Sequence, residues 1–185
     1  VVGYDTRFLS PEFAETVAAV CSAQGIKVFF ANKPAPTPVL SYNVLHHQAA
    51  GAAIITASHN PFGYSGFKFS MPNGAGAPPE FTGKIEAHAE KLLAKGWQPK
   101  TAVIGTFSCP EFDPAPAYLR RIRKLVDLQA IGKAKLRIAV ELMHGTGRGY
   151  LDTLLEEAGA KVTCFHENLN PLFGGGSPEP NESGM

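Results

Sequence analysis

The segment AAGAAIITASHNP, residues 49–61, joins an apolar run to a cluster of polar residues and ends at a proline. Its small and branched apolar residues predict a buried strand over residues 52–56. In a parallel α/β sheet, ligands gather beyond the carboxyl ends of the strands. Ser58, His59 and Asn60 follow this strand, so they are the first candidates for a functional site. A turn that only caps the strand would explain the same residues equally well.

Alternating strands and helices surround this segment and predict the class of the fold. The expected strands of the first unit span residues 1–4, 26–31, 52–56 and 66–71, and its expected helices span residues 10–25, 39–50 and 79–95. Strands that alternate with helices along a chain form βαβ units with a mainly parallel sheet. We therefore predict an α/β fold, in which the first unit is a three-layer α/β/α arrangement around a mainly parallel mixed sheet.

The first helix of this unit carries the clearest start and stop signals. Ser10 is expected as its N-cap, Pro11 occupies the first helical position, and Gly25 ends it. Apolar residues, Phe13 and Val17 among them, recur at helical spacing. This spacing predicts the face of the helix that packs on the sheet.

A second unit follows a proline-rich connection. Residues 96–116 contain four prolines and little periodicity, and we interpret them as the link between the units. Beyond it, helices are expected over residues 117–126 and 149–158, strands over residues 136–142 and 160–165, and a loop over residues 170–185. We predict a first domain over residues 1–112 and a partial second α/β domain of similar type over residues 113–185.

The composition argues against several classes of protein. Seventeen basic residues against sixteen acidic ones give a net charge of +1, so neither a nucleic acid nor a membrane surface is an expected partner. Cys21, Cys109 and Cys164 fit neither a disulfide framework nor a zinc site. We expect reduced cysteines and a cytoplasmic protein. The chain opens on VVGYD without an initiator Met, and we interpret it as a fragment.

Two cationic residues accompany the polar cluster. Lys68 lies in GFKFS, where the alternation of phenylalanine and lysine places one cation on one face of a strand. A lysine near a serine binds phosphate or moves protons, although a solvated edge lysine is the commoner case. Arg7 lies at the end of the first expected strand, in GYDTR. It is expected either to hold an oxyanion through two N–H groups or to form an ion pair at the helix start.

The turn HGTGRG, residues 144–149, is a weaker signal. Its glycines do not have the G-x-G-x-x-G spacing of a dinucleotide site. A glycine-rich turn that packs a helix on a strand explains it at least as well, and a phosphate at the helix start remains an alternative.

The motifs taken together resemble one family of enzymes. They are GYDTR (residues 3–7), TASHNP (56–61), GFKFSMPNGA (66–75), ELMHGTGRG (141–149) and NPLFGGGSPEPN (170–181). In this order they resemble the α-D-phosphohexomutases, which comprise the phosphoglucomutases, phosphomannomutases and phosphoglucosamine mutases. The resemblance covers nearly the whole chain, and the serine motif is its most specific part.

The resemblance implies a role for each polar candidate. Ser58 would carry a phosphoryl group, donate it to a glucose or mannose phosphate, and recover it from the hexose 1,6-bisphosphate that forms. His59 and Lys68 match active-site positions, where proton transfer and phosphate contact are expected. Arg7 and Asn60 are expected to bind substrate or phosphate. A Mg²⁺ ion is expected to bridge the phosphoryl group of Ser58 and three aspartates of a DGDxDR loop.

Several family motifs are missing from the chain. It contains no DGDxDR loop, no sugar-specificity loop of the GEMSGH type, no phosphate-binding loop of the RxSxTEP type and no leading GTDGxRG segment. Of the family's four domains, the chain would hold most of the first and part of the second. We therefore expect this polypeptide alone to have no mutase activity.

Two other functions remain as alternatives. One is a non-catalytic module that binds phosphate or a nucleotide through its glycine turns. The other is a serine hydrolase that uses Ser58 with His59 or another histidine. The hydrolase is disfavoured because the sequence has no G-x-S-x-G elbow and no carboxylate placed to orient a base.

Overall fold

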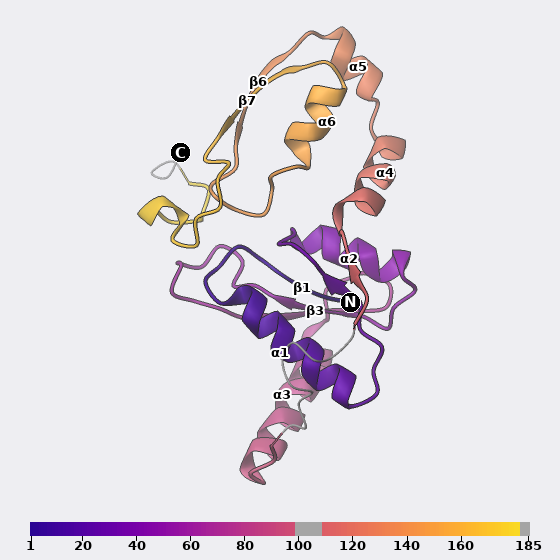
Figure 1. The fold of residues 1–185 in the computed structure, drawn as a ribbon, viewed down its shortest axis with the longest axis vertical. Helices are drawn as coiled ribbons and strands as arrows, with labels where there is room; N and C mark the ends of the chain where they lie inside the picture. Colours follow the sequence, from indigo (N-terminus) through magenta and orange to yellow (C-terminus); the bar gives the residue numbers. More distant parts are fainter. Residues whose placement is uncertain (99–108, 182–185) are drawn as a thin grey trace.

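The structure is a computed structural model that describes residues 1–98 and 109–181 of the chain. It contains two units that follow each other along the chain (Figure 1). The first is built on a five-stranded sheet with the order β4-β3-β1-β2-β5, and the second on the two-stranded sheet β6-β7. The α/β class predicted from the sequence is confirmed.

The first unit contains five strands and three helices within its described residues. Its strands are β1 (Val2–Tyr4), β2 (Phe30–Ala31), β3 (Ala52–Ile55), β4 (Phe67–Ser70) and β5 (Glu111–Phe112), and its helices are α1 (Ser10–Ala23), α2 (Thr37–His46) and α3 (Pro79–Ala94). Strand β1 pairs in parallel with β2 and β3, and β2 pairs in parallel with β5. Strand β4 is antiparallel to β3, so the sheet is mixed but mainly parallel.

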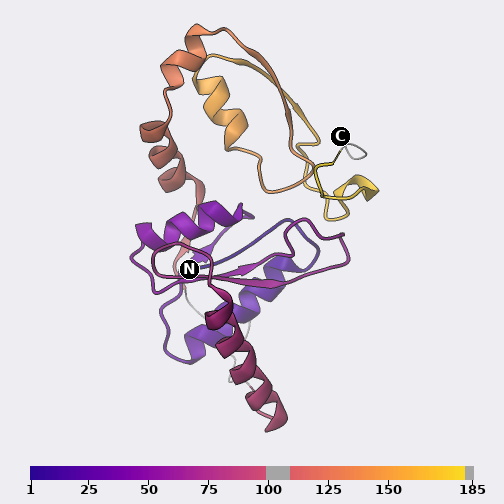
Figure 2. The ribbon, with the colours of Figure 1, turned by 180° about the vertical axis from the view of Figure 1, so that it is seen from behind.

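Helices cover both faces of this sheet, with α2 on one side and α1 on the other, whereas α3 projects away from the unit and buries none of its residues (Figures 1 and 2). Ile54 and Ile55, at the end of β3, point to opposite faces of the sheet, because successive side chains of a strand alternate in direction. Ile54 packs with Leu40 and Val44 of α2. Ile55 packs with Ala14 and other residues of α1. Strand β3 is therefore held between two layers of helices.

The second unit is smaller and shares part of its core with the first. It contains α4 (Ala115–Leu125), α5 (Leu128–Lys133), β6 (Arg137–Glu141), α6 (Leu151–Glu157), β7 (Lys161–Phe165) and the 3₁₀ turn η1 (Phe173–Gly175). Strands β6 and β7 are parallel. Leu119 of α4 and Leu154 of α6 join the buried cluster of α2. Apolar packing therefore connects the two units.

Most differences from the sequence prediction lie at the ends of elements. The strand expected over residues 26–31 is reduced to Phe30–Ala31, and the helix expected over residues 39–50 spans Thr37–His46. Strand β5 was not expected, and it lies inside the predicted connection 96–116. Its two residues form a strand because they pair with β2, which no local pattern shows. Residues 99–108 of the connection lie outside the described residues.

The predicted details of α1 are partly wrong. Ser10 begins the helix, but its side chain does not cap it, because its Oγ donates a 2.7 Å hydrogen bond to Asp5. Phe13, expected on the packed face, is 42% exposed, whereas Ala14 and Ala18 are fully buried. Small alanine side chains allow α1 to lie close to the sheet, and the larger phenylalanine is turned to the solvent.

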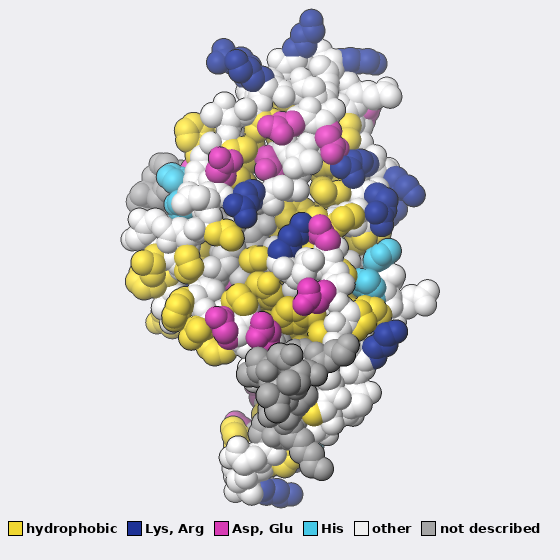
Figure 3. Space-filling model, in the orientation of Figure 1, with side chains coloured by type: hydrophobic (Ala, Val, Ile, Leu, Met, Phe, Trp, Pro, Cys, Tyr) yellow, Lys and Arg dark blue, Asp and Glu magenta, His cyan; other side chains and the backbone are white. Residues whose placement is uncertain are grey.

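Large apolar side chains are exposed on the first unit. Phe8, Phe62 and Tyr64 are exposed to solvent, and all three belong to loops that follow β1 or β3. Hydrophobic side chains also gather on this side of the first unit in the space-filling view (Figure 3). No helix in the described part of the chain is long and apolar enough to cross a membrane.

Candidate functional site

The candidate site is the loop that leaves the carboxyl end of β3 and returns as β4, here called the serine loop (residues 56–66). Its two ends are joined by a 2.9 Å hydrogen bond from the Thr56 N–H to the Gly66 carbonyl. A Cβ atom at Gly66 would lie 2.8 Å from the Thr56 carbonyl oxygen, closer than real Cβ contacts allow. Glycine therefore permits the loop to close tightly at its base.

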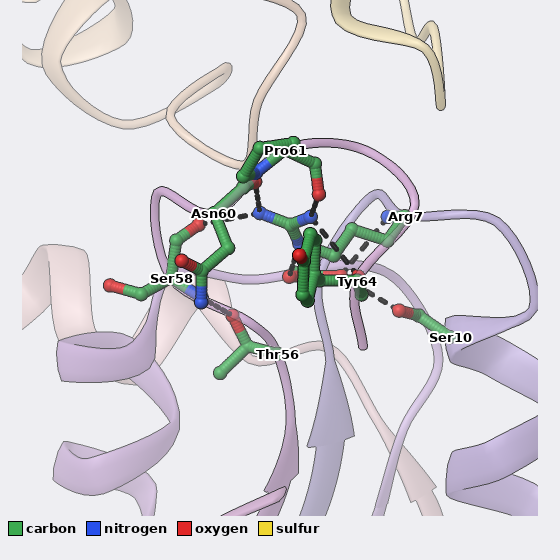
Figure 4. Close-up of polar contacts among 8 residues, drawn as sticks. Arg7, Ser10, Thr56, Ser58, Asn60, Pro61 and Tyr64 are labelled. Carbon is green, nitrogen blue, oxygen red and sulfur yellow. Dashed lines mark hydrogen bonds and ion pairs between the residues drawn. The ribbon is translucent and has the colours of Figure 1, made fainter. Parts of the chain in front are cut away.

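Ser58 occupies an unusual backbone conformation in this loop. Its φ angle of 58° lies in the left-handed region, which residues other than glycine rarely adopt. Its N–H donates a 3.1 Å hydrogen bond to Oγ1 of Thr56, and the Asn60 N–H donates to the Ala57 carbonyl over 3.1 Å. The Ser58 side chain is directed away from the centre of the loop and is exposed (Figure 4). Asn60, a residue type that tolerates such angles better, is not among the residues with a positive φ.

Arg7 lies beneath the serine loop and is 2% exposed. Its Nη1 donates to the carbonyls of Pro61 and Tyr64 over 2.8 and 3.2 Å. Its Nη2 donates to the carbonyls of Ser58 and Asn60 over 2.9 and 2.6 Å (Figure 4). One buried guanidinium thus holds four carbonyl groups of the loop in place.

Asp5 holds Arg7 in turn. Its Oδ2 accepts a 3.1 Å hydrogen bond from Nε of Arg7, and its Oδ1 accepts from the Arg7 N–H and from Oγ of Ser10 over 3.0 and 2.7 Å. A guanidinium has five N–H donors, and all five of Arg7 are used within the protein. Arg7 was expected to hold an oxyanion, but in this conformation it has no free N–H group with which to do so. Arg7 supports the loop instead.

Lys68 lies on β4 directly opposite Ile54 of β3. Paired residues of neighbouring strands share a face, so Lys68 lies on the side of the sheet that α2 covers. Its side chain is exposed, and among the described residues it has no ion-pair partner. Lys68 is thus an available cation at the strand that receives the serine loop.

The closing segment of the second unit (residues 170–181) lies against the serine loop, as Figure 1 shows in yellow. Nδ1 of His59 is 3.4 Å from Oε2 of Glu179, and Cζ of Arg7 is 5.2 Å from the centre of the Phe173 ring. No carboxylate was expected beside His59 from the sequence, and Glu179 shows that this expectation is wrong. Because Glu179 is 120 residues from His59 in the sequence, only the fold could reveal the pair.

No hydrogen bond joins Ser58 to His59 among the described residues. A serine hydrolase needs its serine hydroxyl bonded to the base that activates it. The arrangement therefore gives the hydrolase alternative no support.

The glycine turn (residues 144–149) lies at the carboxyl end of β6. Nδ1 of His144 is 2.9 Å from the Asn168 carbonyl, and Nη1 of Arg148 donates to the Glu167 carbonyl over 3.0 Å. Nearby, the Met143 N–H and the ring of His166 bond the carboxylate of Glu141, and they hold its pKa below the ordinary value. All of these contacts are exposed.

The described residues contain no group of three or more His, Cys, Asp or Glu side chains placed to hold a metal ion. The side chains of this part of the chain therefore do not by themselves fit the Mg²⁺ site that the family resemblance implies.

Comparison with known proteins identifies the class of enzyme. The family model for the α/β/α domain I of phosphoglucomutase/phosphomannomutase matches residues 1–95, and the model for domain II of the same enzymes matches residues 116–185. The chain belongs to the phosphoglucomutase/phosphomannomutase family.

Individual relatives agree with this assignment. The chain is 32% identical to the phosphoglucomutase/phosphomannomutase of Thermococcus kodakarensis over 100% of its own length and 40% of the relative's. It is 32% identical to human phosphoglucomutase-1 over 98% of its length and 37% of that protein. The crystal structure of a phosphomannomutase-like protein from Thermus thermophilus matches with a TM-score of 0.83 and 35% identity, over 98% of this chain and 40% of that one. The chain thus spans about two fifths of these relatives.

Proposed function

We propose that this chain is the phosphoryl-carrying part of a phosphohexomutase, an isomerase that interconverts hexose 1-phosphates and hexose 6-phosphates. The observation that carries the proposal is the exposed hydroxyl of Ser58 on a left-handed turn whose carbonyls are held by four N–H donors of Arg7. A rigid turn holds the phosphoryl group in one position, and phosphoryl transfer depends mainly on such positioning.

The transfer step uses residues of the serine loop and of β4. A hydroxyl of the sugar phosphate attacks the phosphorus, the bond from phosphorus to Oγ of Ser58 breaks, and a hexose 1,6-bisphosphate forms. His59 accepts the proton that the attacking hydroxyl loses, and Oγ of Ser58, which is exposed, takes up a proton from water as it leaves. Lys68 lies against the phosphoryl oxygens and offsets their charge in the transition state. The reverse step, from the other phosphate of the intermediate, restores phosphoserine and releases the isomerised sugar.

Arg7 and Asn60 have different parts in this proposal. Arg7 fixes the loop backbone and does not touch the substrate. The Asn60 side chain is exposed beside Ser58 and is a phosphate-binding group. No step is assigned to a metal ion. In a complete enzyme, the phosphoryl group of Ser58 would be the ligand that this chain offers to Mg²⁺.

Activity and substrate choice are proposals for a longer protein. The relatives named phosphoglucomutase or phosphomannomutase favour glucose and mannose phosphates as substrates. We expect residues 1–185 alone to lack mutase activity, because the missing family motifs would supply sugar recognition. The domain limits 1–112 and 113–185 and a cytoplasmic location remain part of the proposal. One Arabidopsis thaliana relative is named as a probable cytoplasmic phosphoglucomutase.

The test is incubation with glucose 1,6-bisphosphate, for the chain alone and for a full-length protein that contains it, followed by intact mass and phosphopeptide mapping. We expect a gain of one phosphoryl group on Ser58 in the full-length protein. Ser58→Ala should abolish the gain, whereas Ser65→Ala, in the same exposed loop, should keep it. Binding of the bisphosphate with no phosphoryl gain would instead favour a non-catalytic binding module.

A further inference from the structure

We infer that Glu179 of the second unit is a positioning residue for His59. Its carboxylate accepts a hydrogen bond from the Nδ1–H of His59, which keeps the ring proton on Nδ1 and leaves Nε2 free to accept a proton from the sugar hydroxyl. The inference rests on the proposed function, in which His59 accepts a proton, and adds the residue that orients the His59 ring.

The first observation is an unsatisfied carboxylate oxygen. Oε2 of Glu179 is buried and accepts no hydrogen bond from any described residue, although the Glu179 side chain as a whole is 44% exposed. A buried carboxylate oxygen without a donor is costly. Nδ1 of His59 faces this oxygen at 3.4 Å. The neighbouring charges, Arg7 and Asp5, are paired with each other beneath the loop.

The second observation is that Glu179 is held by the second unit. The closing segment follows β7, and Oδ1 of Asn170 accepts a 2.9 Å hydrogen bond from the Leu172 N–H at its start. Phe173 then lies over the guanidinium of Arg7. The segment is therefore docked on the residue that supports the serine loop, and Glu179 is carried to His59 by that docking. His59 thus comes from the first unit, and the carboxylate that orients it comes from the second.

The chemical consequence concerns the tautomer of the imidazole. A neutral imidazole carries one proton, and the hydrogen bond made by one ring nitrogen decides which nitrogen holds it. A carboxylate beside Nδ1 favours the proton there, so Nε2 keeps its lone pair. The His59 side chain is 65% exposed, which leaves the ring accessible to a substrate. Without the carboxylate, the ring proton can move to Nε2, and a protonated Nε2 cannot accept a proton from the sugar hydroxyl.

The experiment is ¹⁵N NMR of the imidazole nitrogens in the unphosphorylated chain, at a pH where the rings are neutral. We expect the Nδ1–H form of His59 to predominate in the wild type. Glu179→Ala should reduce the Nδ1–H fraction at least twofold, whereas Glu179→Gln should largely keep it, because the amide oxygen also accepts a hydrogen bond. Glu167→Ala, an exposed glutamate of the same unit, is the matched control. The exposed His88 on α3 is the internal reference.

A wild-type ring that is mainly protonated on Nε2 would overturn the inference, and so would a Glu179→Ala variant with an unchanged tautomer. The amide spectrum of each variant verifies that it is folded. The result does not depend on phosphorylation. If Ser58 never accepts phosphate while Nδ1–H predominates, the proposed function fails and the pairing of Glu179 with His59 stands. If Ser58 is phosphorylated but Glu179→Ala leaves the tautomer of His59 unchanged, the proposed function stands and the positioning role of Glu179 fails.

Discussion

The serine loop and the glycine turn occupy equivalent places, each at the carboxyl end of a parallel strand, but they are held in different ways. Both contain a residue other than glycine in the left-handed region, with φ angles of 58° at Ser58 and 54° at His144. The serine loop rests on a buried arginine with all its donors used. The glycine turn is held by exposed contacts, such as the one from Arg148 to the Glu167 carbonyl.

This difference shows that the two loops hold left-handed residues with different kinds of support, a buried cation in one and exposed contacts in the other. Burying a cation is expensive and is tolerated only when it is fully paired and hydrogen-bonded. Arg7 meets this condition with loop carbonyls as its main partners, so its burial fixes the backbone on which Ser58 stands. The comparison can be tested by weakening each support in turn.

The largest effect is expected from Arg7→Ala. Removing the cation leaves Oδ2 of Asp5 and four loop carbonyls without their donor, and loss of one partner of a buried pair typically costs about 3–5 kcal/mol. Denaturant unfolding followed by fluorescence measures the loss. Arg148→Ala, the matched change at the glycine turn, should cost less than about 1 kcal/mol. Equal costs at the two sites would contradict the comparison.

Gly66→Ala should have the next largest effect. The new Cβ would meet a backbone oxygen of Thr56 at 2.8 Å, which the loop can relieve only by opening at its base. Such overpacking costs about 1–3 kcal/mol. Thermal unfolding measures it. Gly63→Ala serves as the control in the same loop, because nothing lies within 4 Å of the Cβ that it adds. A Gly66→Ala variant as stable as Gly63→Ala would show that the tight closure is unimportant.

Phe173→Leu should have a smaller effect on stability. It keeps an apolar side chain but removes the ring over Arg7, and a cation–π contact of this kind is worth about 0.5–1 kcal/mol. Phe173→Tyr keeps the ring and should match the wild type. Protection of the closing segment from limited proteolysis reports the docking. Equal cleavage rates in the two variants would show that the ring of Phe173 does not contribute to the docking of the closing segment.

The smallest effect is expected from Glu141 near the glycine turn. Its pKa is held below the ordinary value of 4.5 by the Met143 N–H and by the ring of His166. A carboxyl group with a depressed pKa in the folded state contributes stability above about pH 4.5, and this contribution is lost as the pH falls through the lower, folded value. Glu141→Gln should therefore flatten the pH dependence of the unfolding midpoint as the pH falls below about 4.5. An unchanged profile would mean that the bonds to Glu141 do not form in solution.

The sequence alone pointed to the parts of the site that are local. Ser58 and His59 follow a recognisable strand, and Lys68 stands out between two phenylalanines, so pattern and resemblance found all three. The support by Arg7 was missed because it depends on carbonyl groups more than 50 residues away. Glu179 was missed for the same reason, since it comes from the other unit. Long-range pairing also created β5, which has only two residues of its own.

The fate of a labelled phosphoryl group on Ser58 would test directly whether this serine carries the group that is transferred to the sugar. A full-length protein containing this chain would be prepared with ³²P on Ser58 and mixed with unlabelled glucose 1-phosphate. The label is expected to leave Ser58 and to appear in glucose 1,6-bisphosphate and then in glucose 6-phosphate. A label that stays on Ser58, or that is released only as inorganic phosphate, would contradict this expectation.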